Sequence, residues 1–553
     1  MGGVSLHPRT EPDPPRTLGG LLRRLVAAGP DAVALIDRGP DGEALPLSRG
    51  ELAARVASLT GELSGVAPGD TVAVWLPSWS DALVWQCAVA ARGANVIGVN
   101  TRYGVAEVTH VLERARPSLV VLPAAFHGLD LLDRLRAAVS GYGGPAPEVA
   151  VVPGPGRGPV TDPTGYDVGS GAWSPAAAVP SAAPPGPAPG ATGTVPEDPA
   201  ALVVAFTTSG STGMPKLAAH SADAVVGHAV AAAAAMGLRQ GDTVLGALPL
   251  SGVFGYNAAL AGLAAGAAVL LEPVFDAAAV LQAMAVHRVT HVGAGDDMML
   301  RLAEAWTAER TALPEWRWLG IADFQGRSRE IAEWARDAHG VRTTGLYGSS
   351  EAFALLAMWP DDVPEPQRWT GGGRLVGATT EVRAVDPDSR AELDPGAEGE
   401  LEFRGPTVVD AYLGEPDRPT GDADGWFASG DLGVVTEPGV FTYTCRAGDA
   451  LRLRGFLVDP AEIEVRLAEH PSVHTAKVVG VPGPDGAIRA VAFVVGEDGA
   501  EPDPDALRTW CAEALARFKV PHAVRVLDEM PTTSGTNGTK IRAATLREWA
   551  AAL

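Results

Sequence analysis

The sequence has 553 residues, of which 46% are hydrophobic and 20% are charged, and its formal net charge is −23. A chain of this length is too long for a single hydrophobic core, so we expect two or more domains. The negative charge argues against nucleic acid or an anionic membrane as a partner, because both attract basic proteins.

The three cysteines, Cys87, Cys445 and Cys511, lie far apart and lack the spacing of a metal site. They indicate a reducing compartment rather than a disulfide framework. The first residues carry no apolar core of a secretory signal, and the alanine-rich runs are too short to span a bilayer. We therefore expect a soluble cytoplasmic protein without an integral membrane segment.

The first part of the chain alternates between helical and strand patterns. The predicted elements are helices over 18–28, 50–67 and 85–92 and strands over 70–77 and 95–100. This alternation indicates α/β subdomains with at least partly parallel sheets. Residues 154–196 interrupt the pattern with a stretch rich in Pro, Gly and Ala, which cannot bury enough apolar surface to order itself. We predict a flexible surface insertion there.

The alternation resumes with the apolar strand ALVVAF (201–206) and a helix that begins after Ser221 and ends at Gly237. Further strands are predicted over 243–249, 268–271, 289–293, 316–322 and 341–348. From about Glu381 the strands are short and alternating, which is typical of a small barrel or an antiparallel sheet. Past Arg446 a small α+β unit is expected. Its predicted elements are helices over 459–469 and 504–517 and a strand over 490–496.

The stretch TSGSTGMPK (208–216) follows directly on a predicted buried strand. A loop rich in Gly, Ser and Thr can turn its N–H groups and hydroxyls toward one point, which makes a nest for phosphate oxygens. The stretch is not a Walker A loop, because the order Gly-x4-Gly-Lys-Ser/Thr is absent. Taken alone, it fits an ordinary polar turn equally well.

Together with six later stretches, this loop resembles the motifs of the adenylate-forming (AMP-binding) superfamily, in the same order along the chain. That superfamily includes acyl- and aryl-CoA synthetases, adenylation domains of peptide synthetases, and luciferases. The later stretches are LYGSSEA (346–352), GELEFRGPTVVDAYLG (399–414), GWFASGDLG (425–433), RAGDALRLRGFLVDPAEIE (446–464), ARFKVPHAVRVLDEMPTT (516–533) and NGTKIRAATLRE (537–548). The resemblance extends from about residue 20 to the end.

The resemblance implies an α/β fold with two domains. A large N-terminal domain (1–447) would contain two α/β subdomains with mixed sheets plus a small β-barrel. A small mobile α+β domain (448–553) would follow and rotate about a hinge near Gly448, a residue type that bends freely. The oligomeric state stays open between monomer and homodimer.

The resemblance also implies an activity. The enzyme would use ATP and Mg2+ to convert a small carboxylic acid to an acyl-adenylate, releasing pyrophosphate, and would transfer the acyl group to the thiol of CoA. The alternative is a stand-alone adenylating enzyme that passes the acyl group to a carrier protein or a nitrogen nucleophile. A catalytically silent nucleotide-binding homologue and a luciferase-like oxygenase are further, less favoured readings.

The resemblance assigns most residues of the nucleotide site. The residues matching the loop that cradles the β- and γ-phosphates are Thr208, Ser209, Gly210, Ser211, Thr212, Gly213 and Lys216. Glu351 matches the carboxylate that holds Mg2+, a cation that prefers oxygen ligands, and Ser350 stands before it where the family usually has threonine. Tyr347 and Gly348 match residues that stack on and frame adenine. Thr212 and Glu351 are also expected to act in catalysis.

Asp431 matches the carboxylate that binds the ribose hydroxyls, and Arg446 an arginine that also reaches the ribose. Lys540 matches the catalytic lysine between acid and phosphate, although Thr539 shifts it one residue from the usual Gly-Lys pair. Gly455 matches a loop that lines the thiol tunnel. Without the other motifs, Glu351 would fit a residue of a first helical turn, Asp431 a turn residue and Lys540 a solvated side chain.

Two stretches depart from the family pattern. PLSGVFG (249–255) has Ser251 and Gly252 where an aromatic residue and a histidine are usual, and GIADFQG (320–326) replaces a Gly-Gly-Ala-Pro loop. We therefore expect an atypical acid substrate. The predicted wall of its pocket consists of Ser251, Gly252, Phe254, Gly255, Tyr256, Asp323, Phe324, Gly345 and Phe353.

Overall fold

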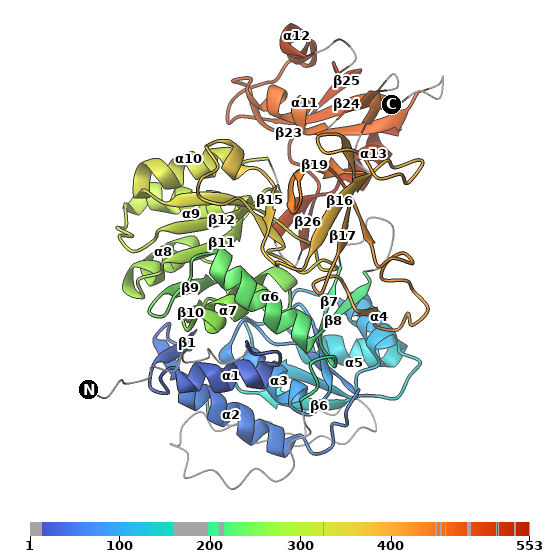
Figure 1. Ribbon diagram of the computed structural model, residues 1–553. Helices are drawn as coiled ribbons and strands as arrows, with labels where there is room; N and C mark the ends of the chain where they lie inside the picture. The colour runs from blue at the N-terminus through green and yellow to red at the C-terminus, as the bar shows by residue number, and fades with distance from the viewer. Residues whose placement is uncertain are drawn as a thin grey trace, which may run out of the picture.

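The computed structural model describes most of the chain. The described residues are 14–158, 197–208, 215–324, 326–447, 451–453, 456–458, 460–483, 488–515, 517, 519–535 and 538–551. Two large sheets with their helices form the N-terminal part, and a smaller unit lies at one end of it (Figure 1). No described helix combines the length and the apolar character needed to cross a bilayer.

The first sheet has seven strands in the order β18-β8-β7-β4-β3-β5-β6. Their bounds are β3 (Thr71–Val74), β4 (Asn95–Gly98), β5 (Leu119–Pro123), β6 (Glu148–Val152), β7 (Leu202–Thr207), β8 (Leu217–Ser221) and β18 (Ala411–Tyr412). The strands β3 to β7 pair in parallel, whereas β8 and β18 are antiparallel to their neighbours. Apolar residues of α4 (Val105–Ala115) and α5 (Leu131–Gly141) cover one face of this sheet.

The second sheet has 13 strands in the order β16-β17-β19-β20-β15-β14-β13-β12-β11-β9-β10-β1-β2. Their bounds are β1 (Val33–Arg38), β2 (Ala44–Ser48), β9 (Thr243–Gly246), β10 (Ala268–Leu271), β11 (His291–Gly295), β12 (Trp318–Ala322), β13 (Arg342–Tyr347), β14 (Ala357–Met358), β15 (Gly372–Leu375), β16 (Glu381–Val385), β17 (Glu398–Arg404), β19 (Phe427–Glu437) and β20 (Val440–Arg446). The section from β1 to β13 pairs in parallel. The strands expected after Glu381 pair antiparallel and continue this sheet.

The remaining helices of the N-terminal part fill the space beside and between the sheets. They are α1 (Leu18–Ala27), α2 (Arg49–Glu62), α3 (Ser80–Ala90), α6 (Ala222–Ala235), α7 (Val253–Ala265), α8 (Ala277–Val286), α9 (Asp296–Glu309), α10 (Ser328–His339) and the 3-10 helix η3 (Gln367–Trp369). The helices α6 and α7 pack against each other near the centre (Figure 1). One apolar cluster contains residues of both sheets and of these helices, so the two halves share a core.

The C-terminal unit has its own core. Its elements are β21 (Leu451–Leu453), β22 (Phe456–Val458), α11 (Pro460–Ala468), β23 (Val473–Pro482), β24 (Ile488–Gly496), α12 (Pro504–Ala514), β25 (Ala523–Leu527), β26 (Thr532–Gly535), β27 (Gly538–Ile541) and α13 (Ala543–Ala551). A sheet of β23, β24 and β25 has one apolar cluster with α11 and α12 and a second with α13. The predicted fold class, a large α/β part followed by a small α+β part, is confirmed, and the strands predicted to form a small β-barrel belong to the 13-stranded sheet. The predicted hinge at Gly448 and most of the insertion lie outside the described residues, and the domain bounds stay predictions.

Most predicted elements are present with small shifts at their ends. The helix predicted over 50–67 ends at Glu62, because Leu63 already leaves the helical region with ψ of 37°. The helix predicted to begin at 85 begins at Ser80. Its first turn is held by the carboxylate of Asp37 on β1, which accepts a hydrogen bond from the Ser80 N–H at 2.8 Å. A partner this distant in sequence leaves no local signal.

Asp37 makes folding stability depend on pH. Burial, and secondly the charge of Asp81, raise the pKa of Asp37 from its ordinary value of 3.8 to about 7. The folded state therefore favours the protonated acid, and this contribution is full below pH 4 and lost as pH rises through 7. Between pH 5 and pH 8 the free energy of unfolding of the wild type should fall on the order of 2 kcal/mol, since one pKa unit is worth about 1.4 kcal/mol. The Asp37→Asn variant lacks the titrating group, so its free energy of unfolding should not show this fall.

Urea unfolding of both proteins at the two pH values measures this difference. Asp41→Asn is the control, because Asp41 is an exposed residue of the adjoining β1–β2 turn. Its pH dependence should equal that of the wild type. An Asp37→Asn variant with the wild-type pH dependence would contradict the assignment.

Candidate active site

The predicted phosphate loop begins at the end of β7, and its two ends meet there. The Thr208 N–H donates to the carbonyl of Lys216 at 2.9 Å. The Thr208 hydroxyl is buried and has no hydrogen-bond partner among the described residues. The Lys216 ammonium lies 5.5 Å from the centre of the Tyr412 ring. The residues between them, 209–214, include Ser209, Gly210, Ser211, Thr212 and Gly213 and lie outside the described part.

Side chains from neighbouring elements hold the base of this loop. His110 of α4 forms a hydrogen bond through Nε2 to the carbonyl of Pro215 at 2.6 Å. The Tyr103 hydroxyl lies 2.6 Å from the Thr207 hydroxyl. These contacts fix the end of β7 and the start of β8, which are the two ends of the predicted phosphate loop.

Glu351 lies beside the same strand end. The Ser350 hydroxyl donates to the carbonyl of Thr207 at 3.4 Å, and the Val409 N–H donates to the carbonyl of Glu351 at 2.6 Å. Burial, and secondly the negative charge of Glu351, raise the pKa of Tyr412 to about 12. A carboxylate and the buried Thr208 hydroxyl are oxygen donors of the kind that Mg2+ prefers, and the residues present fit this cation.

Asp431 is the best-defined carboxylate of the site and is 3% exposed. Its Oδ2 accepts a hydrogen bond from the Tyr347 hydroxyl at 2.5 Å, and its Oδ1 lies 3.0 Å from Nε of Arg446. Asp431 and Arg446 are opposite each other on β19 and β20. Burial lowers the pKa of Arg446, but the charge of Asp431 and the smaller contributions of Tyr347, Tyr443 and Glu351 together outweigh it, and the pKa lies above its usual value. The site therefore holds a paired charge rather than an isolated one.

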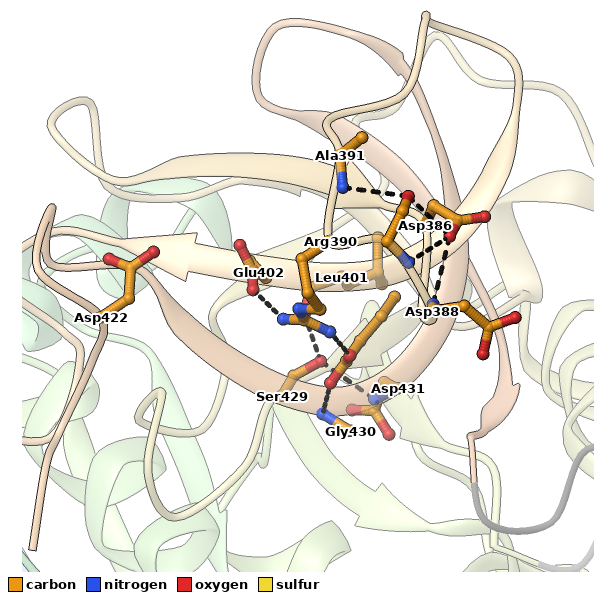
Figure 2. Close-up of polar contacts among 12 residues, drawn as sticks. Asp386, Asp388, Arg390, Ala391, Leu401, Glu402, Asp422, Ser429, Gly430 and Asp431 are labelled. Atoms are coloured by element: carbon orange, nitrogen blue, oxygen red, sulfur yellow. Dashed lines mark hydrogen bonds and ion pairs between the residues drawn. The ribbon is translucent and has the colours of Figure 1, made fainter.

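The bend that carries Asp431 is held by polar contacts on both sides (Figure 2). The Ser429 hydroxyl donates to the carbonyl of Leu401 at 2.6 Å and accepts from the Asp431 N–H at 3.0 Å. The Gly430 N–H donates to a carboxylate oxygen of Glu400 at 3.2 Å, and Gly430 has φ of 71°, where glycine is favoured. Arg390 bridges the carboxylates of Glu400 and Glu402 on β17.

The Tyr347 ring lies in an aromatic cluster. Its centre is 5.0 Å from that of Phe441, 5.5 Å from Phe403 and 5.8 Å from Tyr443. Burial, and secondly the charge of Asp431, raise the pKa of Tyr347 well above its usual value, so the phenol remains a hydrogen-bond donor. The ring is 7% exposed. Its predicted stacking on adenine, and the framing by Gly348, stay predictions.

Two aromatic rings of the predicted acid pocket lie against one strand. A Cβ atom added to Gly293 would approach the Phe254 ring to 3.3 Å, and one added to Gly295 would approach the Phe324 ring to 2.8 Å. Alternate residues of a strand point to the same face, so both rings pack on the same face of β11. Asp296, which is buried, accepts hydrogen bonds from the N–H groups of Phe324 and Arg327, each at 3.2 Å.

The other predicted pocket residues are spread more widely. The rings of Tyr256 and Phe353 are both buried against Phe206, at 5.5 and 6.0 Å. Gly345 has no room for a side chain, since an added Cβ would lie 1.9 Å from the carbonyl oxygen of Thr370. Asp323 is exposed. Ser251 is buried, and Gly252 caps the start of α7, which also carries Gly255. The structure therefore places Phe254 and Phe324 against β11, and Tyr256 and Phe353 against Phe206.

Lys540 lies on β27, paired with Thr533 of β26. β27 contacts α9, the helix that follows directly on β11. The hairpin of the small C-terminal unit therefore reaches the N-terminal part at the helix that follows the strand on which the two rings pack. Gly455 lies outside the described residues, and its predicted role in the thiol tunnel stays a prediction.

Comparison with known families accounts for this arrangement. The model of the AMP-binding enzyme family matches residues 22–413, and that of the AMP-binding enzyme C-terminal domain matches 462–536. The chain belongs to the AMP-binding enzyme family.

Relatives of this AMP-binding enzyme include CoA ligases. A feruloyl-CoA synthase of Amycolatopsis sp. is 30% identical over 88% of this chain and 91% of its own length. The 4-coumarate–CoA ligase 1 of Oryza sativa subsp. japonica is 32% identical, and the match covers 60% of this chain and 61% of that protein.

Similar solved structures include ATP-bound MatB from Rhodopseudomonas palustris, with a TM-score of 0.80, 26% identity and coverage of 96% of this chain and 98% of that one. The amide bond synthetase McbA from Marinactinospora thermotolerans has a TM-score of 0.79 and 28% identity, and the match covers 96% of this chain and 99% of the McbA chain.

The sequence motifs missed several polar residues of this AMP-binding enzyme's site. Asp296 follows the strand that faces the rings, and His220, His228 and Asn257 lie beneath the segment that begins at Glu351. Buried polar residues of this kind carry no spacing signature. Their one sequence signal is that they are polar residues within runs of apolar residues. Burying a polar group without a hydrogen bond costs free energy, so such a residue indicates a buried hydrogen bond.

Proposed function

We propose that this AMP-binding enzyme joins a small carboxylic acid to CoA in two steps. In the first, an oxygen of the acid attacks the α-phosphorus of ATP, a new P–O bond forms, and the bond to pyrophosphate breaks. In the second, the thiol sulfur of CoA attacks the acyl carbon, a C–S bond forms, and AMP leaves. The observation that supports this best is the arrangement of Asp431, Tyr347 and Arg446 near the strand ends that carry Thr208 and Glu351.

Each group has a role in this reaction. The loop from Thr208 to Lys216 would bind the outer phosphates, and Asp431 with Arg446 would hold the ribose. Glu351 would hold Mg2+, which when bound offsets the charge of the phosphates. Lys540 would place a positive charge between the acid and the α-phosphate, where negative charge accumulates. The proposal includes a domain division at 1–447 and 448–553. The second domain carries Lys540 and would rotate to remove this lysine from the site before the thiol enters.

The acceptor has a second candidate. The amide bond synthetase McbA is about as similar in structure as MatB, with TM-scores of 0.79 and 0.80. A nitrogen nucleophile is therefore the favoured alternative to CoA, and the resemblance also allows a carrier-protein arm. A cytoplasmic location follows from the use of ATP and CoA and fits the three free cysteines among the described residues.

One pair of assays tests the proposal. ATP–pyrophosphate exchange across a panel of aryl, alkyl and dicarboxylic acids identifies the acid, and product formation with CoA, amines or a carrier protein then identifies the acceptor. Exchange followed by thioester supports the CoA ligase. Exchange followed only by amide supports the alternative, and no exchange with any acid would contradict adenylation.

A further inference from the structure

The segment 351–355, between β13 and β14, has an unusual backbone. Phe353 and Leu355 have φ of 56° and 63°, in the left-handed region that residues with a side chain seldom adopt. Glu351 opens this segment, and only the surrounding structure can keep two such residues in this conformation. The position of the Glu351 carboxylate therefore depends on what holds the segment.

Three buried polar side chains hold it. His220 of β8 forms a hydrogen bond through Nε2 to the carbonyl of Ser350 at 2.7 Å. His228 of α6 does the same to the carbonyl of Ala354 at 2.8 Å, and Nδ2 of Asn257 on α7 donates to that carbonyl at 2.5 Å. The three residues are 0%, 3% and 0% exposed. One carbonyl before Glu351 and one after it are thus fixed from three separate elements.

The histidines also enclose the side chain of the strained residue Phe353. Its ring centre lies 4.8 Å from the His220 ring and 5.4 Å from the His228 ring, both in edge contact. Burial lowers the pKa of both histidines to about 4, so each is neutral near pH 7. A carbonyl oxygen can only accept a hydrogen bond, so the hydrogen of each neutral ring is on Nε2.

We propose that His220, His228 and Asn257 are positioning residues that keep the Glu351 carboxylate where Mg2+ binds. This inference rests on the proposed function, in which Glu351 holds Mg2+. Residues behind a metal ligand orient it, and their loss typically costs about 10- to 100-fold in metal affinity or activity. Without the contacts to Ala354, the segment can relax toward an ordinary backbone and carry the carboxylate away.

The test uses the full chain and replaces the hydrogen-bond donors of His228 and Asn257 without leaving a cavity in the core. His228→Phe and Asn257→Leu remove the hydrogen bonds to Ala354 at similar volume, and His228→Gln keeps an N–H donor. The matched control is His291→Phe, since His291 on β11 is also buried and lies 3.1 Å through Nε2 from the carbonyl of Met236. Asn257→Ser repeats the test with a smaller change to the core.

Two measurements are made on each variant. The first is the Mg2+ concentration that gives half-maximal ATP–pyrophosphate exchange, and the second is amide hydrogen exchange in the peptide covering 351–355. His228→Phe and Asn257→Leu should raise the required Mg2+ about tenfold or more and speed hydrogen exchange there. His228→Gln should recover part of both effects, and His291→Phe should change neither.

Glu351→Gln distinguishes the positioning role of His228 and Asn257 from the role of Glu351 in holding Mg2+. If it raises the required Mg2+ and the variants at His228 and Asn257 do not, the positioning role is overturned and the proposed function stands. Faster hydrogen exchange with an unchanged Mg2+ requirement also overturns the positioning role, as does an equal effect of His291→Phe. If Glu351→Gln leaves the Mg2+ requirement unchanged, the role of Glu351 fails, and this inference fails with it.

Discussion

Lys540→Ala should lower ATP–pyrophosphate exchange by about 10²–10³-fold, because a charge aimed at the developing transition state is worth this much in a closed site. The second step should be spared. A supplied acyl-adenylate should still form its thioester with CoA at close to the wild-type rate. Exchange is measured with the acid that the panel identifies, and transfer is measured with the matching acyl-adenylate.

A second lysine of the C-terminal unit serves as the control. Lys477 on β23 forms an ion pair with Glu464 at 2.9 Å, and it lies outside the hairpin that carries Lys540. Lys477→Ala should leave both steps near their wild-type rates. Normal exchange in Lys540→Ala would remove Lys540 from the site, and equal loss of both steps would indicate damage to the fold rather than loss of a charge.

Asp431→Ala should raise the KM for ATP about 100-fold or more. A hydrogen bond to a charged group is worth about 1.5–3 kcal/mol, and this carboxylate is expected to accept one from each ribose hydroxyl. The sharper measurement compares ATP with 2′-deoxy-ATP. The wild type should bind 2′-deoxy-ATP more weakly than ATP. The Asp431→Ala variant should bind the two nucleotides about equally, since it lacks the carboxylate that accepts the hydrogen bond from the 2′-hydroxyl.

Glu437→Ala provides the comparison on the same strand. Glu437 ends β19, is 62% exposed and forms an ion pair with Arg374 at 3.6 Å. Its replacement should leave the KM for both nucleotides unchanged. If Asp431→Ala kept the full wild-type preference for ATP over 2′-deoxy-ATP, Asp431 would not contact the 2′-hydroxyl.

The sequence predicted the residues of the site through short stretches that resemble family motifs. The loop after β7, the carboxylate after β13, Asp431 and Arg446 each lie in a stretch of adjacent residues of this kind. Strand and helix patterns also predicted the fold class, because burial repeats every two residues in a strand and about every 3.6 in a helix. These features can be read without knowing what packs against them.

The remaining features depend on contacts between distant parts of the chain. His228 and Asn257 meet the carbonyl of Ala354 across separations of 126 and 97 residues. The start of α3 depends on Asp37, which lies 43 residues earlier. The packing of Phe254 and Phe324 on β11 requires two glycines whose role appears only in three dimensions. A single sequence contains no measure of such distances.

The two apolar clusters on either side of β23, β24 and β25 have a thermodynamic consequence. Each cluster is made only of residues of the C-terminal unit, so the rotation that the proposed function requires would expose neither cluster to water. The free-energy difference between the two orientations would then depend on the contact between the units, and not on the larger hydrophobic energy inside them. Under that proposal, replacing pyrophosphate with the acceptor substrate would be enough to change the preferred orientation.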